Sequence, residues 1–544
     1  MSLPNNLLKV NLIMKSNTNL TQLLDDAVII TPNNQALIGL DSVITYKQFY
    51  GASISLSNYL STNTSNGTVA IMVPNLLAFP VCLFGIWYAD RTATLVNPLY
   101  TSDELLKQCL DAKVTTIIIA KIFYKILEPI IKDTQIQSVI TVEIGDLQSS
   151  IKRHIVNLIT CIKRKILIIQ KQPGISYISL DSVLKKYSNT FTNVKFKNKI
   201  ALLQYTGGTS GALKAAILKH ENILANIYQL AHWLPKDINK NSSILTALPL
   251  YHIFALTINC LLFIHIKGTS ILVLNPREIK QLIDPLKKYT VDVITGVNTL
   301  FGVLIRHKDF KKLNWSKLKV AISGGMPLDK KISDEWQLTI GKPIVQGYGL
   351  TECSPVVSAE NYETTEFSGS VGKPLTGTKI KILDESLKLM KINELGEICI
   401  KGPQVMDSYW HKKDLNRKIF TKDGYFRSGD VGYIDKKGRI FIVDRMKDMV
   451  IVSGFNVYPC DVEQILNQHP DVVESACIGV DNKVSGQSVK AFVVKKSGSS
   501  LEKRELIEYC KKYLTHYKIP KKIEWVEALP KSSVGKILKR KLTH

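Results

Sequence analysis

The sequence predicts an α/β protein with a large N-terminal domain and a small C-terminal domain. The chain has 544 residues and 45% of them are hydrophobic, which is more than one ordinary core accommodates. Buried-strand patterns alternate with helical patterns through the first two-thirds, which favours mostly parallel or mixed sheets flanked by helices. From Gly377 to Val443 short alternating strands are separated by glycine-containing turns, which favours a small antiparallel β unit that closes the large domain.

The strands expected in the first two-thirds are short apolar runs rich in β-branched residues. They are Thr68–Met72, Thr115–Ala120, Ser138–Val142 and Ser270–Leu274. The strands and turns of the antiparallel unit read GTKIKIL, GEICIKG, DGYFRSGD and KKGRIFIVD.

The tail after Arg445 has the length of a small domain and a mixed α+β pattern. Its expected elements are a hairpin at Met449–Tyr458, helices at Asp461–Gln468 and Glu502–Leu514, and strands at Glu474–Gly479 and Val489–Lys495. We therefore place the domain boundary near Lys447, with residues 1–446 in the large domain and residues 447–544 in the small one.

The charge balance favours anionic partners. Lysine and arginine number 71 against 46 acidic residues, so the formal net charge is +25, which suits nucleotides, a membrane surface or nucleic acid. Lysine is abundant along the whole chain, so a solvated surface explains much of this charge. The sequence has no zinc-finger spacing or other nucleic-acid motif, and we expect no nucleic-acid partner.

The cysteines and the N-terminus favour a cytoplasmic protein. The nine cysteines are dispersed and none forms a Cys-x-x-Cys pair, which is typical of a reducing compartment. The N-terminal residues MSLPNNLLKVNLIMKSN contain no sustained apolar segment, which argues against secretion.

Two stretches raise the question of membrane contact. Ile244–Ile264 is nearly uncharged and about long enough to cross a bilayer, but Pro249, His252 and Asn259 favour a buried strand, turn and helix. Ile151–Ile169 repeats apolar residues at helical spacing among basic ones. This pattern suits a helix on an anionic lipid surface and equally suits a helix with a buried apolar face. The apolar positions are Ile151, Ile155, Leu158, Ile159, Ile162 and Ile166, and the basic ones are Lys152, Arg153, Lys163, Arg164 and Lys165.

The strongest chemical signal is the segment QYTGGTSGALKAAILKH, residues 204–220, which follows an apolar strand and precedes a helix. Glycines allow backbone N–H groups to approach a phosphate closely, while hydroxyl groups and a lysine supply further donors and a positive charge. The Gly-Lys-Ser/Thr ending of a Walker loop is absent. The residues concerned are Tyr205, Thr206, Gly207, Gly208, Thr209, Ser210, Gly211 and Lys214.

This segment resembles the phosphate loop of the adenylate-forming (AMP-binding) enzyme superfamily, which includes acyl-CoA synthetases, luciferases and adenylation domains of peptide synthetases. Five later segments resemble further motifs of that family and follow in the family's order. They are SGGMPL (Ser323–Leu328), GYGLTE (Gly347–Glu352), DGYFRSGD (Asp423–Asp430), DRMKDMVIVSGFNVYP (Asp444–Pro459) and PKSSVGKIL (Pro530–Leu538).

The resemblance is most specific to bacterial long-chain fatty acid–CoA ligases, through LPLYHIFALTINCLLF, VNTLFGVL, GYGLTECSPVVS and KGPQVM. It implies that ATP activates a long-chain fatty acid to acyl-AMP with release of pyrophosphate. Coenzyme A then accepts the acyl group, which yields acyl-CoA and AMP. The implied partners are ATP, Mg²⁺, coenzyme A and the fatty acid, with peripheral association at the cytoplasmic face of the membrane and a homodimer among the oligomeric states it allows.

The resemblance also implies roles for the nucleotide-binding residues. Tyr348 stacks on adenine, Glu352 binds Mg²⁺, and Asp430 and Arg445 hold the ribose hydroxyls. A core tyrosine or a structural ion pair would explain the same residues. The glycines and the hydroxyl that line the nucleotide are Gly324, Gly325, Gly347, Gly349 and Thr351.

The catalytic and hinge residues are implied in the same way. Lys536 bridges the fatty carboxylate and the α-phosphate in the first half-reaction, and Lys214 accompanies the phosphate loop. The small domain then rotates about Lys447 and brings Gly454, which leaves room for pantetheine, to the site. His252 corresponds to the gate between the ATP site and an acyl tunnel, although a lone buried histidine is usually structural.

An apolar tunnel is expected for the acyl chain, with Val297, Leu300, Phe301 and the run Phe254–Phe263 as its lining. The sequence departs from the family pattern at Ala215, where glycine follows the lysine, and at Asp90 and Arg91, where a small residue is usual. Two other readings stay open. One is a ligase that delivers acyl-AMP to a carrier protein, and the other is a non-catalytic acyl- or nucleotide-binding protein.

Overall fold

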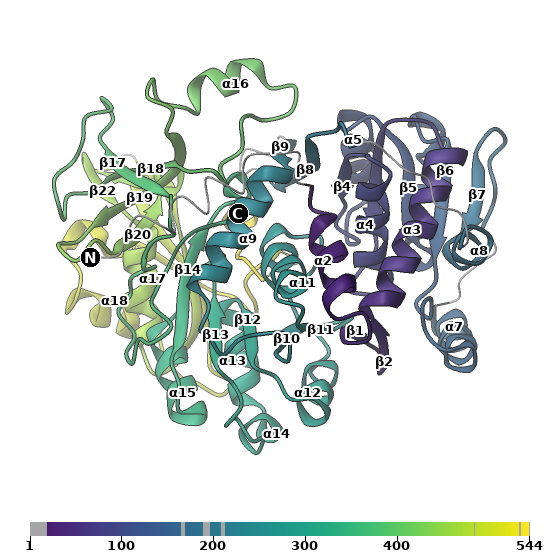
Figure 1. The fold of residues 1–544 in the computed structure, drawn as a ribbon. Helices are drawn as coiled ribbons and strands as arrows, with labels where there is room; N and C mark the ends of the chain where they lie inside the picture. Colours follow the sequence, from purple (N-terminus) through teal and green to yellow (C-terminus); the bar gives the residue numbers. More distant parts are fainter. Residues whose placement is uncertain are drawn as a thin grey trace, which may run out of the picture.

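The computed structural model describes residues 19–164, 169–188, 196–207, 213–482, 485–532 and 535–542. Two α/β layers, seen side by side in Figure 1, make up most of the molecule, and a yellow C-terminal part packs beside the second layer. The predicted α/β class is confirmed by the sheets and their helices. Of the basic amphipathic stretch predicted from the sequence, Lys165 and Ile166 lie outside the described residues.

The first sheet has the strand order β7-β6-β5-β3-β4-β8-β9 and is parallel except for the final hairpin β8–β9. Its strands are β3 (Thr68–Met72), β4 (Ala93–Leu95), β5 (Val114–Ala120), β6 (Ser138–Val142), β7 (Ser176–Ser179), β8 (Ile200–Gly207) and β9 (Leu213–Lys219). The helices that accompany it are α3 (Tyr46–Asn63), α4 (Ala78–Tyr88), α5 (Ser102–Asp111), α6 (Tyr124–Leu127), α7 (Ser150–Arg164) and α8 (Leu180–Lys186).

The second sheet has the order β16-β15-β14-β13-β12-β10-β11-β1-β2, with parallel strands in its centre and antiparallel pairs at both edges. Its strands are β1 (Gln35–Gly39), β2 (Ser42–Thr45), β10 (Ser243–Thr246), β11 (Thr269–Leu272), β12 (Val293–Gly296), β13 (Val320–Ser323), β14 (Ile344–Gly349), β15 (Val356–Ala359) and β16 (Lys373–Pro374). Its helices are α2 (Gln22–Ile30), α9 (His220–Trp233), α12 (Ile279–Lys288), α13 (Asn298–Arg306), α14 (Lys308–Lys311) and α15 (Lys330–Ile340).

The nearly uncharged stretch from Ile244 to Ile264 is a buried strand and helix, as predicted. Strand β10 is followed by a continuous helical segment made of α10 (Ile253–Ala255), the π-helix η3 (Leu256–Leu262) and α11 (Phe263–His265). Every side chain of the π-helix is buried. Among the described residues, no helix combines the length and apolar character needed to cross a membrane.

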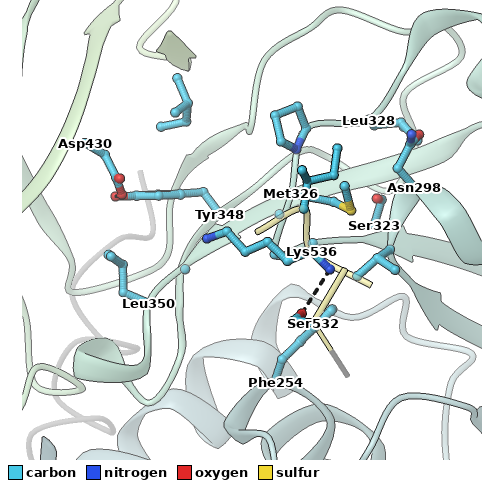
Figure 2. A pocket seen from close by; sticks show the side chains of 18 of the residues that line it. Phe254, Asn298, Ser323, Met326, Leu328, Tyr348, Leu350, Asp430, Ser532 and Lys536 are labelled. Carbon is cyan, nitrogen blue, oxygen red and sulfur yellow. Dashed lines mark hydrogen bonds between the residues drawn. The ribbon is translucent and has the colours of Figure 1, made fainter. Parts of the chain in front are cut away.

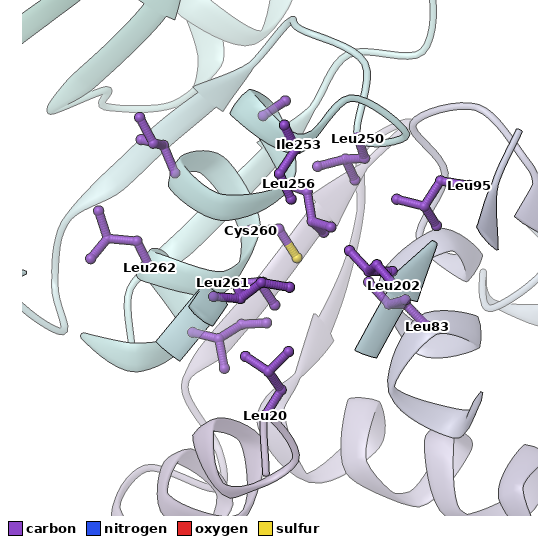
Figure 3. Close-up of a cluster of buried hydrophobic side chains, with 14 of the residues drawn as sticks. Leu20, Leu83, Leu95, Leu202, Leu250, Ile253, Leu256, Cys260, Leu261 and Leu262 are labelled. Atoms are coloured by element: carbon purple, nitrogen blue, oxygen red, sulfur yellow. The ribbon is translucent and has the colours of Figure 1, made fainter. Parts of the chain in front are cut away.

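The main hydrophobic core lies between the two layers. Figure 3 shows Leu256, Cys260 and Leu261 of the π-helix facing Leu83 and Leu202 of the first layer. All five side chains are fully buried or nearly so, and close packing of this kind is the main source of stability for the domain. This core fixes the relative position of the sheets whose strand ends border the site.

The predicted antiparallel unit is confirmed in the order β17-β18-β19-β20. Its strands are β17 (Lys379–Leu383), β18 (Gly396–Lys401), β19 (Phe426–Ile434) and β20 (Ile440–Arg445), and α16 (Lys413–Lys418) lies in the connection from β18 to β19. Strand β20 leads directly into the single turn η5 (Met446–Asp448). The segment beyond that turn belongs to a separate sheet.

The C-terminal sheet has the order β22-β21-β24-β23, with β25 parallel to β24. Its elements agree with the predicted ranges to within a few residues. They are β21 (Val450–Val452), β22 (Phe455–Val457), α17 (Pro459–Gln468), β23 (Val472–Asn482), β24 (Gly486–Lys495), α18 (Lys503–Lys511) and β25 (Lys522–Trp525). Besides η5, the described residues form the single 3-10 turns η1 (Lys121–Phe123), η2 (Ile131–Asp133), η4 (Thr351–Cys353), η6 (His516–Lys518) and η7 (Lys539–Lys541).

Candidate active site

A large cavity of about 2260 Å³ lies between the second sheet, the antiparallel unit and the C-terminal sheet. The carboxyl ends of β13 and β14 open onto it, which is where parallel sheets commonly place a ligand. Most of the predicted site residues line this cavity. They are Tyr205, Thr206, Lys214, His252, Gly324, Gly325, Gly347, Tyr348, Gly349, Thr351, Glu352, Asp430, Arg445, Lys447 and Lys536.

The hairpin β8–β9 carries the predicted phosphate loop. Thr206 pairs with Lys214 across the hairpin, and the Thr206 hydroxyl donates to the Lys214 carbonyl at 3.5 Å. Gly207 ends β8. Tyr205 contacts the helix α5, because its hydroxyl donates to Asp111 at 2.5 Å. The loop residues Gly208, Thr209, Ser210 and Gly211 lie outside the described residues.

A buried carboxylate joins a tyrosine and an arginine at one wall of the cavity. The Tyr348 hydroxyl donates to Asp430 Oδ2 at 2.6 Å, and Arg445 Nε lies 3.0 Å from Asp430 Oδ1. Burial of the guanidinium lowers the pKa of Arg445, but the surrounding negative groups, Asp430 first among them, together outweigh this and raise the pKa overall. The Tyr348 ring is therefore held in place at the cavity wall by its hydroxyl.

Burial and the adjacent Asp430 carboxylate raise the pKa of Tyr348 well above its usual value, so the hydroxyl remains a donor. Figure 2 shows the Tyr348 ring between Asp430 and the Lys536 side chain. A flat aromatic ring, a carboxylate and a guanidinium in this order suit a purine base and its attached ribose.

Glu352 is buried at the opposite side of the same strand end, in the turn η4. The Tyr409 hydroxyl donates to Glu352 Oε1 at 2.6 Å, and Lys214 Nζ lies 5.9 Å from the centre of the Tyr409 ring. The Glu352 backbone carbonyl accepts from Met406 at 2.8 Å. The carboxylate is thus oriented by Tyr409 and lies on the phosphate-loop side of the cavity.

Close backbone contacts explain why glycines border the nucleotide-sized part of the cavity. A Cβ on Gly324 would lie 3.1 Å from the Phe254 ring, and a Cβ on Gly349 would lie 2.3 Å from the Pro355 carbonyl oxygen. Gly325 has a φ of +79°, which L side chains rarely adopt. Residues with side chains would therefore close this part of the cavity or distort β14.

The C-terminal loop carries Lys536 into the cavity. A turn holds the loop, since Ser532 N donates to the Lys536 carbonyl at 2.7 Å and Lys536 N donates to the Ser532 hydroxyl at 3.1 Å (Figure 2). Gly535 has a φ of +83°, and a Cβ there would lie 2.8 Å from Thr299 Oγ1 and 3.1 Å from Val297 Cγ2. The loop thus packs tightly against the start of helix α13 in the large domain.

Both domains surround the Lys536 ammonium, although it stays accessible to solvent in the cavity. Removal of bulk solvent and the positive charge of Arg445 lower the pKa of Lys536 to about 8, while Asp430 opposes the shift. A cation of reduced pKa at the centre of an open cavity is poised to bind an anionic ligand.

His252 caps helix α10, with its Nδ1 accepting from Phe254 N at 3.4 Å. Burial and the Lys536 charge lower the pKa of His252 to about 4, so the imidazole is neutral at physiological pH. His252 also lines the cavity. The capping contact gives it a structural role, and its predicted role as a gate stays a prediction.

Part of the cavity lining is an apolar wall. It includes parts of the predicted run from Phe254 to Phe263, together with side chains of helix α9. The lining residues are Leu230, Trp233, Phe254, Ile258, Leu262 and Phe263.

The expected tunnel residues at positions 297–301 divide between the cavity and the core. Val297 lines the cavity. Phe301 does not, because it is fully buried against Trp336 with ring centres 5.0 Å apart, and Leu300 packs on the same core cluster. The helical pattern in VNTLFGVL thus arises mainly from packing of α13 on the second sheet.

Lys447 and Gly454 occupy different environments. Lys447 is exposed in the turn η5 between the antiparallel unit and the C-terminal sheet, and it lines the cavity. Its pKa is lowered, mainly by partial burial. Gly454, with a φ of +82°, forms the β21–β22 turn with open space around its Cα, away from the cavity lining.

The departures from the family pattern have structural explanations. Ala215 is a buried residue of regular β9, where it pairs with Tyr205 and its carbonyl accepts from Trp410 at 2.8 Å. Asp90 accepts from the backbone N–H groups of Lys197 and Asn198 at 2.9 to 3.1 Å. Neither Ala215 nor Asp90 lines the cavity.

Arg91 is also structural. Its guanidinium is buried and donates to backbone carbonyls that include Gly67 O, at 3.0 Å, and Ser65 O. The polar pair at positions 90 and 91 thus ties the end of α4 to neighbouring loops.

Sequence reasoning missed two residue groups at the site. Tyr409 orients Glu352, and nothing in its sequence context distinguishes it from a core tyrosine. Lys539 pairs with Glu463 at 2.7 Å. Despite burial, that carboxylate raises the pKa of Lys539. The ion pair anchors the Lys536 loop to helix α17, and only the spatial proximity of the two segments reveals it.

Comparisons with known proteins agree with this geometry. Residues 24–410 match the family model described as AMP-binding enzyme, and residues 461–536 match the model described as AMP-binding enzyme C-terminal domain. The chain is 41% identical over 533 residues to a long-chain-fatty-acid–CoA ligase of Yersinia pestis, covering 96% of this chain and 94% of that protein.

The fold is similar to that of MatB from Rhodopseudomonas palustris at 26% identity, covering 97% of this chain and 98% of that chain. The TM-score is 0.84 for the ATP-bound form and 0.74 for the apo form of that protein. The sequence matches, the shared fold and the clustering of the expected residues around one cavity lead to one conclusion. The chain belongs to the AMP-binding enzyme family, in which the bacterial long-chain-fatty-acid–CoA ligases are its relatives.

Proposed function

We propose that the protein is an AMP-forming long-chain fatty acid–CoA ligase. The observation that carries the proposal is the convergence of Lys536, the Tyr348–Asp430–Arg445 cluster and Glu352 around one cavity with an apolar extension. Such a cavity offers complementary groups to a purine ribonucleotide, its phosphates and a fatty carboxylate.

In the first half-reaction, a fatty carboxylate oxygen attacks the α-phosphorus of ATP and the bond to the pyrophosphate oxygen breaks. Tyr348 stacks on the adenine, and Asp430 accepts from the ribose hydroxyls while Arg445 holds Asp430. Lys536 bridges the attacking carboxylate and the α-phosphate, so its charge offsets the negative charge that builds up during transfer. Lys214 and Thr206 stand beside the departing phosphates.

The residues present fit a Mg²⁺ ion that is bound largely through the nucleotide. Glu352 offers one buried carboxylate, and Mg²⁺ commonly takes one or two carboxylates plus phosphate oxygens. Within the described residues, no cluster of three or more His, Cys, Asp or Glu side chains forms a metal site on its own. When bound, the ion would neutralise charge on the phosphates, and Glu352 would hold it in the position that Tyr409 fixes.

In the second half-reaction, the thiolate of coenzyme A attacks the carbonyl carbon of acyl-AMP and AMP leaves. The Gly535 loop packs on α13 and places Lys536 in the cavity lining, and Gly454 does not line the cavity. We infer that residues 447–544 form a mobile domain that rotates about Lys447, withdraws Lys536 and brings Gly454 to the site. The better fit to the ATP-bound than to the apo form of MatB supports an adenylating arrangement.

A long-chain substrate is supported by the apolar wall of the cavity, which includes Trp233, Ile258 and Phe263. The relatives named as long-chain-fatty-acid–CoA ligases support the same substrate class. Since such substrates partition into membranes, we propose peripheral association with the cytoplasmic membrane face. We also propose that the protein forms a homodimer.

The test is product analysis after incubation with ATP, Mg²⁺, coenzyme A and either palmitate or octanoate. The account predicts palmitoyl-CoA, AMP and pyrophosphate in equal amounts, with a higher kcat/KM for palmitate. Accumulation of acyl-AMP without thioester would favour delivery to a carrier protein. ATP binding without turnover of either fatty acid would favour a non-catalytic binding protein.

A further inference from the structure

Helix α7 directs an apolar stripe toward solvent. Ile151, Ile155 and Leu158 lie three to four residues apart, which is the spacing of one helical face. Their exposed fractions are 78%, 53% and 62%. Scattered exposed apolar residues are ordinary on protein surfaces, whereas an aligned row on one helix marks an interaction surface.

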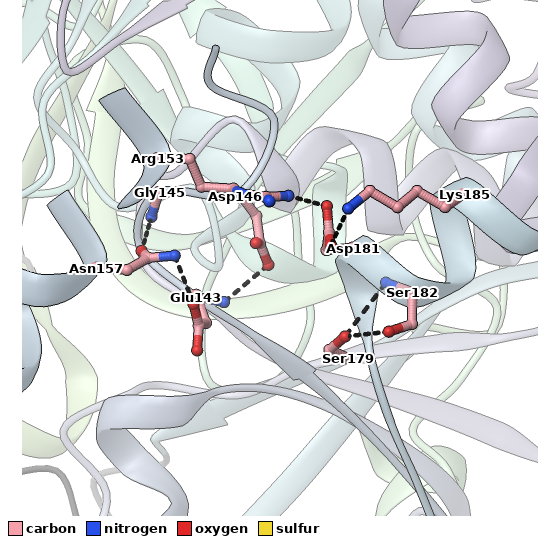
Figure 4. Close-up of polar contacts among 9 residues, drawn as sticks. All are labelled: Glu143, Gly145, Asp146, Arg153, Asn157, Ser179, Asp181, Ser182 and Lys185. Atoms are coloured by element: carbon pink, nitrogen blue, oxygen red, sulfur yellow. Dashed lines mark hydrogen bonds and ion pairs between the residues drawn. The ribbon is translucent and has the colours of Figure 1, made fainter. Parts of the chain in front are cut away.

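The opposite face of α7 is polar and attaches the helix to the molecule. Asn157 Oδ1 accepts from Gly145 N at 2.7 Å, and the Asn157 amide donates to Glu143 (Figure 4). Arg153 forms an ion pair with Asp181 at the start of helix α8. A rotation of about 100° per residue places positions 153 and 157 opposite positions 151, 155 and 158.

This orientation reverses the usual one for a surface helix. Amphipathic helices of globular proteins normally bury the apolar stripe and expose the polar face. Of the two interpretations that the sequence allowed, the buried apolar face is therefore wrong for Ile151, Ile155 and Leu158. Because the polar face attaches α7 to the molecule, the apolar stripe is exposed among the described residues and can contact another molecule.

The charge of α7 indicates the partner. Besides Arg153, which pairs with Asp181 on the opposite face, the sequence of the helix contains Lys152, Lys163 and Arg164 and no acidic residue. A helix with an apolar stripe and basic flanks suits an anionic bilayer, where the stripe enters the headgroup region and the cations meet lipid phosphates. Figure 1 places α7 at the outer end of the first layer, away from the C-terminal sheet.

We propose that α7 is the element that lies on the surface of an anionic bilayer. Only the advantage of this membrane binding rests on the proposed function, because a ligase at the membrane surface has direct access to fatty acids dissolved in the bilayer. The stripe would lie parallel to the membrane plane, and Arg153 and Asn157 would transmit the attachment to the first sheet.

The test compares binding of the full chain to vesicles of neutral phosphatidylcholine and to vesicles that also contain phosphatidylglycerol. Two double variants change α7, Ile155→Glu with Leu158→Glu and Ile155→Ser with Leu158→Ser. A matched control carries Leu389→Glu and Ile392→Glu, which replaces one leucine and one isoleucine that are 68% and 58% exposed in the antiparallel unit. The control introduces the same charge as the glutamate variant of α7.

Wild type and the control are expected to sediment with anionic vesicles and to bind neutral vesicles more weakly. Both α7 variants should lose at least about tenfold in vesicle affinity, since burial of two large apolar side chains supplies more than that. Equal binding of all proteins would overturn the proposal. A wild-type dimer that the α7 variants convert to a monomer, with no vesicle binding, would assign the stripe to a protein interface and overturn it as well.

Two assays separate this inference from the proposed function. Turnover of octanoate in vesicle-free solution should be unchanged in the α7 variants, whereas turnover of palmitate supplied in anionic vesicles should fall. If wild type lacks ligase activity with both acids but binds anionic vesicles through α7, the proposed function fails and the inference stands. If wild type is active but α7 changes nothing, the inference fails alone.

Discussion

At the scale of single residues, the site depends on a few charges whose positions are fixed by neighbouring hydrogen bonds. Asp430 is held by Tyr348 and Arg445, and Glu352 is held by Tyr409. Such contacts fix the orientation of a carboxylate before any ligand arrives, so less reorganisation is needed on binding. Lys536 differs, because its surroundings lower the pKa of its ammonium group. An anionic ligand bound beside it would favour the charged form.

The first prediction concerns the pH dependence that Lys536 imposes. Its pKa is lowered to about 8, so the ammonium is present below that pH and is lost as the pH rises through it. The kcat/KM for acyl-AMP formation, which reports the free enzyme, should therefore fall above about pH 8. The measurement is pyrophosphate release across pH 6 to 10, an interval about two units to either side of that pKa.

Lys536→Arg serves as the comparison for this profile. A guanidinium keeps its charge in proteins at all of these pH values, so the variant should be slower but should lose the alkaline decline. A decline of the same shape in both proteins would assign it to another group.

The second prediction concerns Tyr409. Removal of its hydroxyl in Tyr409→Phe frees the Glu352 carboxylate to rotate, and loss of such orienting contacts typically costs about tenfold or more in metal affinity. The Mg²⁺ concentration for half-maximal adenylation should rise accordingly. Tyr425→Phe, in the antiparallel unit, is the control and should leave the Mg²⁺ titration unchanged. An unaltered titration in Tyr409→Phe would show that Tyr409 does not position the metal ligand.

At the scale of elements, a loop with a left-handed glycine, Gly535, brings Lys536 to the large domain. Gly535 combines a φ of +83° with a close approach to Thr299 and Val297. Gly498 has a similar φ of +76° with open space around it. A side chain at either position would strain the backbone, but only a side chain at Gly535 would also disturb the contact with the large domain. Comparison of the two positions therefore isolates the effect of that contact.

The third prediction uses this pair. Gly535→Ala should slow acyl-AMP formation about tenfold or more, because the new methyl group meets α13 and such overpacking costs about 1 to 3 kcal/mol, in addition to the backbone strain of a non-glycine residue at positive φ. Gly498→Ala should change thermal stability slightly and leave adenylation intact. Both rates come from single-turnover assays. Equal adenylation rates in the two variants would contradict the tight docking.

Sequence reasoning worked best where local pattern and chemistry agree. Apolar runs such as Thr68–Met72 form strands, as predicted, and all residues of this strand are buried. A strand that is covered on both faces of a sheet is typically a continuous apolar run. Residues that the family motifs identified as site residues, such as Asp430 and Lys536, line one cavity. In both cases the signal is contained in neighbouring positions of the chain.

Sequence reasoning was weaker where a residue's partner lies far along the chain. Phe301 has the pattern of a tunnel residue, yet it packs on Trp336. The orientation of α7 depends on Asp181, Glu143 and Gly145, which the amphipathic pattern does not contain. Tyr409 acquires its role only through its hydrogen bond to Glu352.

At the scale of the whole molecule, two half-reactions compete for one cavity. Lys536 occupies the position where the carboxylate and the α-phosphate are expected to meet, while Gly454 lies away from the cavity lining. The turn η5 between the two parts holds Lys447, whose side chain is exposed. The proposed rotation at this turn would reconcile the two requirements.

The fourth prediction restricts that rotation. Lys447→Pro fixes the local φ near about −65°, so the arrangement that suits adenylation should persist while the second arrangement becomes costly. Acyl-AMP formation should stay within about threefold of wild type, since the chemistry of that step is untouched. Thioester formation from supplied acyl-AMP should fall strongly. Equal loss of both half-reactions would indicate a folding defect, which a thermal melt would reveal, or a different hinge.

The most direct test of the central claim is to measure the two half-reactions separately in wild type and in Lys536→Ala. Pyrophosphate release from ATP and palmitate reports the first, and palmitoyl-CoA formation from supplied palmitoyl-AMP reports the second. The account predicts that Lys536→Ala slows the first about a hundredfold to a thousandfold, as removal of a charge-stabilising group does, and leaves the second nearly unchanged. Pyrophosphate release at the wild-type rate in Lys536→Ala would contradict it.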